Sequence, residues 1–308
     1  MPVLAGLDPA ALRTLAAVAR HGTFDAASGA LHVTPSAVSQ RIKALERQVG
    51  RVLVMRSKPA IPTPAGQVLL RLATQVDLLE REALAELTGE PAGDESLPAE
   101  APYAEVPLVV NADTLATWIL PALASVQRRH RVTFELLRED EGHSTELLRQ
   151  GRVVAAVTSD PRPVQGCRVL PLGRMRYLPV ATGEYVARWF PDGPRPGDLA
   201  CAPMVSFDRK DTLQEDMLRR ITRQRLAPPT HYIPSSRDFD DAVRLGLGWG
   251  MVPQGWIRAD LDSGALVPIA EGRHADVALH WQHWRLASPL LNALTEAVQD
   301  AARRELIR

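Results

Sequence analysis

The segment from Thr34 to Gly50 constrains the fold most, because it carries the signals for both ends of a helix and has two distinct faces between them. Thr34 before Pro35 is typical of a helix start, since the N–H that proline lacks would be unpaired in the first turn anyway. Gly50 is a suitable stop. The spacing predicts an apolar stripe of Val38, Ile42, Leu45 and Val49 and a polar face of Ser36, Gln40, Lys43 and Arg47.

Two shorter helices are predicted before this one. The first covers residues 7–20 and stops at Gly22, and the second begins after Thr23 and ends at Val33. A short strand over 52–54 and a basic, proline-rich turn over 56–62 follow the helix that stops at Gly50. Two short helices, a tight connection and a third helix with a hydrogen-bonding face describe a helix-turn-helix with a wing. A three-helix bundle with a solvated polar face is the alternative.

The charge distribution favours DNA binding. The chain of 308 residues has a net charge of zero, but residues 1–62 hold eight Lys and Arg against three acids. A basic head on an acidic body indicates that the head contacts a polyanion. The major groove admits one helix, whose outer face must offer hydrogen-bond donors, whereas a wing contacts phosphates. The candidate DNA contacts are Thr34, Pro35, Ser36, Ser39, Gln40 and Lys43 in the helix and Arg56 and Lys58 in the wing.

A long helix is predicted over residues 63–87, followed by a hinge over 88–105 that is rich in proline, glycine and acids. Apolar residues in the helix recur in alternating steps of 3 and 4, which is the seam of a helix that pairs with another helix. The candidate dimerisation residues are Leu69, Leu72, Val76 and Leu79.

From residue 106 onward, predicted strands and helices alternate, which indicates an α/β domain with helices on both faces of its sheets. Among these elements are a helix over 114–126 and strands over 168–172 and 176–181. The start of the chain lacks the pattern of a signal peptide, and no apolar run approaches the length of a membrane span. We therefore expect a cytoplasmic protein.

The sequence offers little support for an enzyme. His280 and His283 are three apart on a predicted strand and so point to opposite faces, which disfavours a metal site. The glycines of 246–250 follow a helix and lack the spacing of a dinucleotide-binding loop. We expect neither catalysis nor a cofactor nor a metal. A solute-binding protein without DNA function is a further alternative, but it would need an export signal and would not carry residues 1–90.

Several motifs resemble those of a known family. The stretch GTFDAASGALHVTPSAVSQRIKALE (22–46), with GRVLVMR (50–56) and TPAG (63–66), closely resembles the N-terminal motif of LysR-type transcriptional regulators. The wing, Lys58–Pro62, departs from the family pattern. Three further motifs resemble the LysG/ArgP branch, whose members sense basic amino acids and activate exporter genes, and have also been described as inhibitors of chromosome initiation: NADTLATW (111–118), RYLP (176–179) and GLGWGMVP (246–253).

The resemblance implies a domain order. A winged helix-turn-helix at 1–62 is joined by the dimerisation helix at 63–87 and the hinge at 88–105 to an effector domain at 106–308 that is similar to periplasmic binding proteins. Its first lobe covers about 106–180 and 277–308, and its second about 181–276. The effector would bind near the start of the first helix of each lobe, where a carboxylate is attracted. The candidate effector contacts are Asn111, Asp113, Thr114, Asp140, Asp208, Ser235 and Ser236.

The effector implied by the resemblance is lysine or arginine, with histidine third; a different effector is the alternative. Asp113 would hold an ammonium or act only as a cap, and Thr114 would either meet the carboxylate or cap the helix. Asp140 or Asp208 would meet the side-chain cation. The family usually forms tetramers as dimers of dimers, and RNA polymerase is a further candidate partner.

Overall fold

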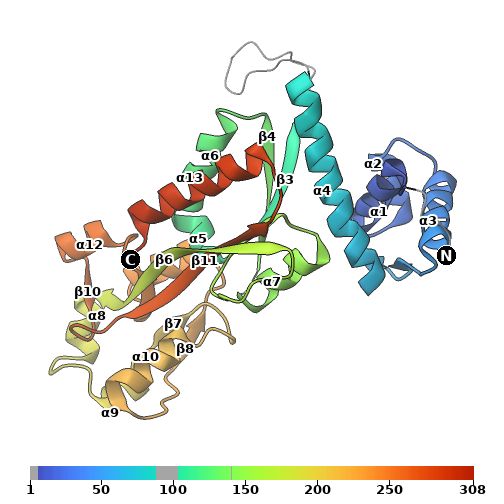
Figure 1. Ribbon diagram of the computed structural model, residues 1–308. Helices are drawn as coiled ribbons and strands as arrows, with labels where there is room; N and C mark the ends of the chain where they lie inside the picture. Colours follow the sequence, from blue (N-terminus) through green and yellow to red (C-terminus); the bar gives the residue numbers. More distant parts are fainter. Residues whose placement is uncertain (1–5, 88–102, 140) are drawn as a thin grey trace. The chain divides into compact units, whose positions relative to one another are not determined.

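The N-terminal helices follow the helix-end signals of the sequence. In the computed structural model, which describes residues 6–87, 103–139 and 141–308, α1 spans Pro9–His21, α2 Phe24–Ala30 and α3 Pro35–Val49 (Figure 1). The Thr34 hydroxyl accepts a hydrogen bond from the Ala37 N–H at 3.2 Å. Gly50 ends α3 with a φ of 70°, a left-handed conformation that glycine adopts without strain. Both predicted ends of α3 are confirmed.

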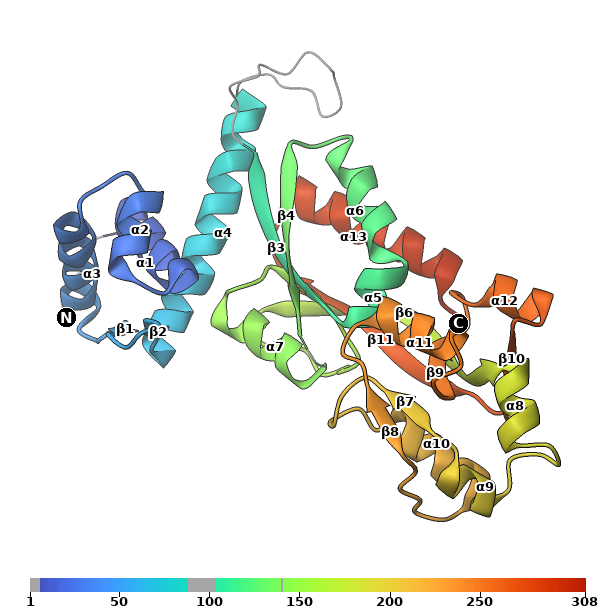
Figure 2. The same ribbon diagram turned by 180° about the vertical axis from the view of Figure 1, so that it is seen from behind.

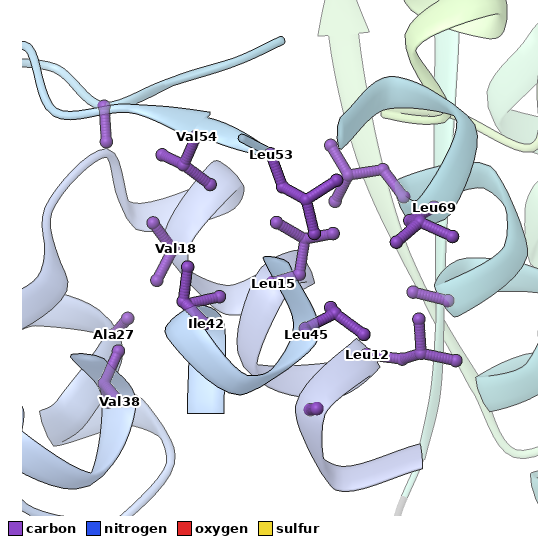
Figure 3. Packing of buried hydrophobic residues seen from close by; sticks show 14 residues of the cluster. Leu12, Leu15, Val18, Ala27, Val38, Ile42, Leu45, Leu53, Val54 and Leu69 are labelled. Atoms are coloured by element: carbon purple, nitrogen blue, oxygen red, sulfur yellow. The ribbon is translucent and has the colours of Figure 1, made fainter. Parts of the chain in front are cut away.

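A single apolar cluster holds these helices and the wing together (Figure 3). Leu15 of α1 and Ile42 of α3 are fully buried in it, and Leu53 joins them from the chain that leads into the wing. The wing pairs β1, Val54–Met55, with β2, Ile61–Pro62, in antiparallel fashion, so the predicted strand over 52–54 begins two residues later. Burial of the α3 stripe therefore sets which face of α3 points outward.

Helix α4, Pro64–Leu87, uses the first part of its predicted seam inside its own domain. Leu69 is 8% exposed within the N-terminal cluster, and Leu72 packs against that cluster. Val76 is half-buried and Leu79 is 39% exposed. Only the later part of the seam thus remains exposed enough for a partner helix. The predicted hinge falls mostly on residues 88–102, which lie outside the described residues.

The described chain forms two compact units. The first contains Met1–Val110, Leu123–Leu170 and Trp281–Ala297, and the second Asn111–Ala122, Pro171–His280 and Val298–Arg308. Within the first, β3 (Ala104–Val110) pairs in parallel with β4 (Val132–Arg138) on one side and β5 (Ala155–Thr158) on the other. The remaining helices with residues in this unit are α6 (Ile119–Gln127), α7 (Glu141–Gln150) and α13 (Pro289–Glu305).

The second unit contains the segments that carry all the candidate effector residues that the structure describes (Figure 2). Strand β6, Cys167–Thr182, pairs in antiparallel fashion with β9 (Gly250–Pro253) and β10 (Leu266–Pro268), and β7 (Met204–Ser206) pairs in parallel with β8 (Thr230–Tyr232). This unit also contains α5 (Ala112–Thr117), α8 (Gly183–Trp189), α9 (Pro196–Cys201), α10 (Leu213–Thr222), α11 (Ser236–Arg244), α12 (Arg258–Ser263) and the first part of β11 (Ala275–Trp284).

Two predicted boundaries in the α/β part are wrong. The helix predicted over 114–126 is two helices, α5 and α6, because the backbone leaves the helical conformation at the buried Trp118. The two strands predicted over 168–172 and 176–181 are the single strand β6. The strand passes close to the chain at Ile307, and it can do so because Gly173 has no Cβ. A Cβ there would lie only 2.7 Å from the Ile307 carbonyl oxygen. The short elements α9, β9, α12 and β10 were not predicted.

One arginine ties α11 to α12. The Arg244 guanidinium contacts Asp240 one turn earlier on α11, and its Nη2 lies 2.7 Å from Oδ2 of Asp260 on α12. The Asp240 side chain is only 1% exposed, and its Oδ1 has no hydrogen-bond partner in the part of the chain that the structure describes. Burial raises the pKa of Asp240 to about 6, although the Arg244 charge opposes the rise.

This burial predicts a pH dependence of stability. Folding raises the pKa of Asp240 from its ordinary 3.8 to about 6, so its contribution to stability is present below about pH 4 and is lost as the pH rises through 6. Asp240→Asn removes the ionisable group. The unfolding free energy of the variant minus that of wild type should rise by about 3 kcal/mol between acid and neutral pH. Urea unfolding at a series of pH values measures it.

Asp238→Asn is the matched control, because Asp238 is an exposed acid in the first turn of the same helix and is not among the groups that shift the pKa of Asp240. The difference in unfolding free energy between this control and wild type should stay nearly constant over the same pH range. A pH-independent difference for Asp240→Asn would show that Asp240 keeps its ordinary pKa when buried.

Candidate DNA interface and effector site

Helix α3 presents the predicted donors to solvent. Ser36, Gln40 and Lys43 are exposed, Ser39 is half-buried, and the opposite stripe is buried in the N-terminal cluster. Thr34 has a structural role as the helix cap, and its hydroxyl also lies 2.9 Å from that of Ser36. Pro35 is exposed at the first helical position. The outer face of α3 thus offers a hydroxyl, an amide and an ammonium, which suit base edges in a major groove.

The other two predicted DNA contacts, Arg56 and Lys58, lie in the wing. The Arg56 guanidinium lies over the Phe24 ring, 5.1 Å from its centroid, which restrains the arginine beside the start of α2. Lys58 is exposed in the turn between β1 and β2. The turn is fixed to the helices by a hydrogen bond from the Ala60 N–H to the Gly22 carbonyl oxygen at 2.7 Å.

Arg47 and Arg51, near the C-terminal end of α3, were not among the predicted DNA contacts. A hollow beside that helix is lined by Gln40, Lys43 and Arg47 together with Arg51 and Val52 from the loop that follows. Three cations therefore line the hollow, and the Glu46 carboxylate at its edge accepts a hydrogen bond from the Leu53 N–H at 2.9 Å. The signal was present in the sequence, since Arg47 belongs to the predicted polar face and Arg51 follows the stop glycine.

The candidate effector residues of α5 have unequal roles. Asn111 caps the helix, since its Oδ1 accepts from the Thr114 N–H at 2.8 Å. Thr114 is therefore in the first turn and is not the cap. Its buried hydroxyl has no hydrogen-bond partner among the residues that the structure describes. An unpartnered buried hydroxyl costs free energy unless something binds it.

Asp113, also on α5, is the centre of the candidate site. The Tyr177 hydroxyl on β6 donates a hydrogen bond to its Oδ2 at 2.6 Å. Burial of the carboxyl group raises the pKa of Asp113, the hydroxyls of Tyr177 and Ser236 lower it, and the charge of Asp211 raises it; the net shift is upward. The structure thus brings together Asp113 and Ser236, which were predicted, with Tyr177 and Asp211, which were not.

The loop after β7 holds two aspartates in different ways. Asp208, the predicted partner for a side-chain cation, has its Oδ1 occupied by the N–H groups of Lys210 and Asp211 at 2.7 and 3.0 Å. Asp211 accepts from the Phe207 N–H at 3.2 Å and the Leu213 N–H at 3.0 Å, and its charge acts on Asp113. Asp208 therefore shapes the loop, and the charge of Asp211 acts on Asp113.

Two other predicted effector residues remain. Ser235 precedes α11 without making a side-chain capping bond. Asp140 lies outside the described residues. Among the helices that the structure describes, none combines the length and the hydrophobicity that a membrane span requires.

Comparison with known proteins agrees with this arrangement. The family "Bacterial regulatory helix-turn-helix protein, lysR family" matches residues 9–67, and "LysR substrate binding domain" matches 104–303. The chain is 44% identical to ArgP of Mycobacterium tuberculosis, with a TM-score of 0.84, covering 98% of this chain and 99% of that one. It is 39% identical to full-length LysG of Corynebacterium glutamicum with bound effector Arg, with a TM-score of 0.78, covering 98% and 100%.

A curated relative extends the comparison to a named role. The "Lysine export transcriptional regulatory protein LysG" of Corynebacterium glutamicum is 40% identical over 96% of this chain and 98% of its own length. The winged helix-turn-helix, the α/β effector domain and these full-length similarities lead to one conclusion: the chain belongs to the LysR family of bacterial transcriptional regulators, in the group that contains LysG and ArgP.

Proposed function

We propose that this protein binds DNA through α3 and the wing and responds to a cationic amino acid, arginine or lysine first and histidine third, bound at Asp113. The target is a gene for an amino-acid exporter, as the name of the Corynebacterium glutamicum relative suggests. Such a regulator acts on the chromosome in the cytoplasm, and RNA polymerase is the partner that activation would require.

The DNA-binding half of the proposal is supported by the outward donors of α3. Replacing Gln40 and Lys43 together with alanine removes an amide and an ammonium from the exposed face. If each side chain hydrogen-bonds to a base edge, its removal should weaken specific binding by about 1–3 kcal/mol. A gel-shift assay on DNA from upstream of the protein's own gene and of neighbouring exporter genes measures this decrease in affinity.

Gln127→Ala is the control, because Gln127 is also exposed but belongs to α6. It should bind as wild type does. If the double variant keeps its full affinity while the wild type binds specifically, α3 does not enter the groove.

The effector half rests on one observation: Asp113 accepts a hydrogen bond from the Tyr177 hydroxyl at 2.6 Å, and its pKa is raised by burial and by the charge of Asp211. Two neighbouring carboxylates repel, and a cation between them relieves that repulsion. A neutral or acidic ligand would leave them uncompensated. The bound arginine of the Corynebacterium glutamicum LysG structure points to the same class of ligand.

Isothermal titration should show heat with arginine or lysine and none with leucine or glutamate. Asp113→Asn removes the negative charge and should weaken binding by about 1.5–3 kcal/mol, the range for a hydrogen bond to a charged group. Effector-free DNA binding should persist, because α3 and α5 belong to separate domains.

Asp238→Asn is the matched control, since Asp238 is an exposed acid in the first turn of α11. It should bind the effector as wild type does. Binding of an aromatic acid or a sugar phosphate, with none of any basic amino acid, would overturn the proposed effector class and leave DNA binding untouched.

We also propose that the protein pairs through the later part of the α4 seam, and that dimers associate into tetramers. The half-buried Val76 and the 39% exposed Leu79 support this surface. Val76→Asp places a charge in an apolar contact without a partner, which is strongly unfavourable. Light scattering should show a smaller assembly for Val76→Asp and an unchanged one for Gln75→Asp, which adds the same charge beside the seam. Equal masses for both variants would exclude this face of α4.

A further inference from the structure

The hollow beside α3 extends the outer face of that helix beyond the residues proposed to read bases. Gln40 and Lys43, the proposed base contacts, line this hollow together with Arg47 from the last turn of α3 and Arg51 from the loop that follows. Both arginines are exposed. One continuous surface therefore joins the proposed base-reading side chains to two further cations.

The two arginines are not occupied by acids of the chain. The Arg47 Nε donates to the Lys43 carbonyl oxygen at 3.4 Å, which keeps the side chain along the helix. Among the residues that the structure describes, no carboxylate forms an ion pair with Arg47 or Arg51. Arg20 of α1 differs, since it pairs with Glu105 at 2.6 Å. The guanidinium groups at the end of α3 are therefore available to an external anion.

Glu46 explains how an acid fits in a cationic hollow. Its carboxylate accepts a hydrogen bond from the Leu53 N–H at 2.9 Å, and its backbone carbonyl accepts from the N–H groups of Gly50 at 2.8 Å and Arg51 at 3.2 Å. These three bonds fix the loop that carries Arg51. Glu46 is thus a positioning residue, and the cations that line the hollow outnumber it.

The length of α3 indicates what these arginines meet. The helix has 15 residues and is therefore about 22 Å long, whereas the major groove is about 12 Å wide. The rise from Ser36 to Arg47 is about 16 Å along the helix axis. With Ser36 and Gln40 among base edges, the end of α3 and the loop after it lie near the phosphates that border the groove.

We propose that Arg47 and Arg51 bind phosphates of the DNA strand at the border of the groove that α3 enters. A guanidinium suits this partner, because its planar fork can donate two N–H groups to one phosphate. The inference rests on the proposed function, since it needs α3 in the groove. It adds two contacts that hold the protein on DNA of any sequence and that make its affinity depend on salt.

Titrations followed by fluorescence anisotropy test the proposal on the full-length protein. Affinity is measured at several NaCl concentrations for two labelled duplexes, one from upstream of the protein's own gene and one with the same bases shuffled. Arg47→Gln and Arg51→Gln should each weaken binding to both duplexes by the same factor. Each lost phosphate contact should reduce the slope of log affinity against log salt concentration by about 0.9.

Three further variants separate charge from other effects. Arg47→Lys keeps the positive charge and should keep the wild-type slope. Gln40→Ala removes a proposed base contact, so it should lower the affinity ratio between the two duplexes without changing the slope. Arg225→Gln removes an exposed arginine from the loop after α10 and should leave both the slope and the ratio as in wild type.

The possible failures are distinct. A wild-type slope for either arginine variant would overturn the inference for that arginine and leave DNA binding by α3 intact. An altered affinity ratio with an unchanged slope would assign the arginine to a base edge and also overturn the phosphate contact. Absence of wild-type binding to either duplex, even at low salt, would overturn the proposed DNA binding and this inference together.

Discussion

The DNA-binding end of the molecule depends on the burial of one helical stripe. Val38, Ile42 and Leu45 are each at most 1% exposed, and an α-helix with that stripe buried can turn only the opposite side to solvent. The same cluster takes in Leu53 before the wing and Leu69 of α4, so the wing and the following helix are fixed relative to α3 by shared apolar contacts. The donors on the outer face need no further support, because the core behind them sets their direction.

The effector site depends on a different constraint, which is the cost of placing carboxylates out of water. Asp113, Asp211 and Asp240 all belong to the same unit, and each is stabilised in its own way. Backbone N–H groups hold Asp211, and Arg244 pairs with Asp240. Asp113 is held by the Tyr177 hydroxyl, which compensates a charge less than a cation does. Asp113 is thus the least compensated of the three carboxylates, and a cationic ligand would stabilise its charge the most.

Local signals in the sequence predicted the local structure well. The caps Thr23 and Thr34 and the stop glycines Gly22 and Gly50 are where they were predicted, since each depends only on the backbone within a few residues. The break at Trp118 and the continuous strand through Gly173 were missed because tertiary contacts decide them: Trp118 is buried, and Gly173 lies against the chain near Ile307. Tyr177 was noticed only as part of a motif, and Asp211 was passed over for Asp208. No spacing rule relates β6 or the loop after β7 to α5.

The choice between Asp208 and Asp211 shows what sequence reasoning lacks at such a site. Both aspartates follow β7 in a loop of the kind where ligand-binding residues gather, so position alone does not separate them. The distinction comes from the turn: Asp208 bonds to the N–H groups two and three residues later, which is the ordinary behaviour of an aspartate that begins a turn. That turn precedes Asp211, whose charge acts on Asp113. The first aspartate therefore shapes the loop, and the second carries the charge that acts on Asp113.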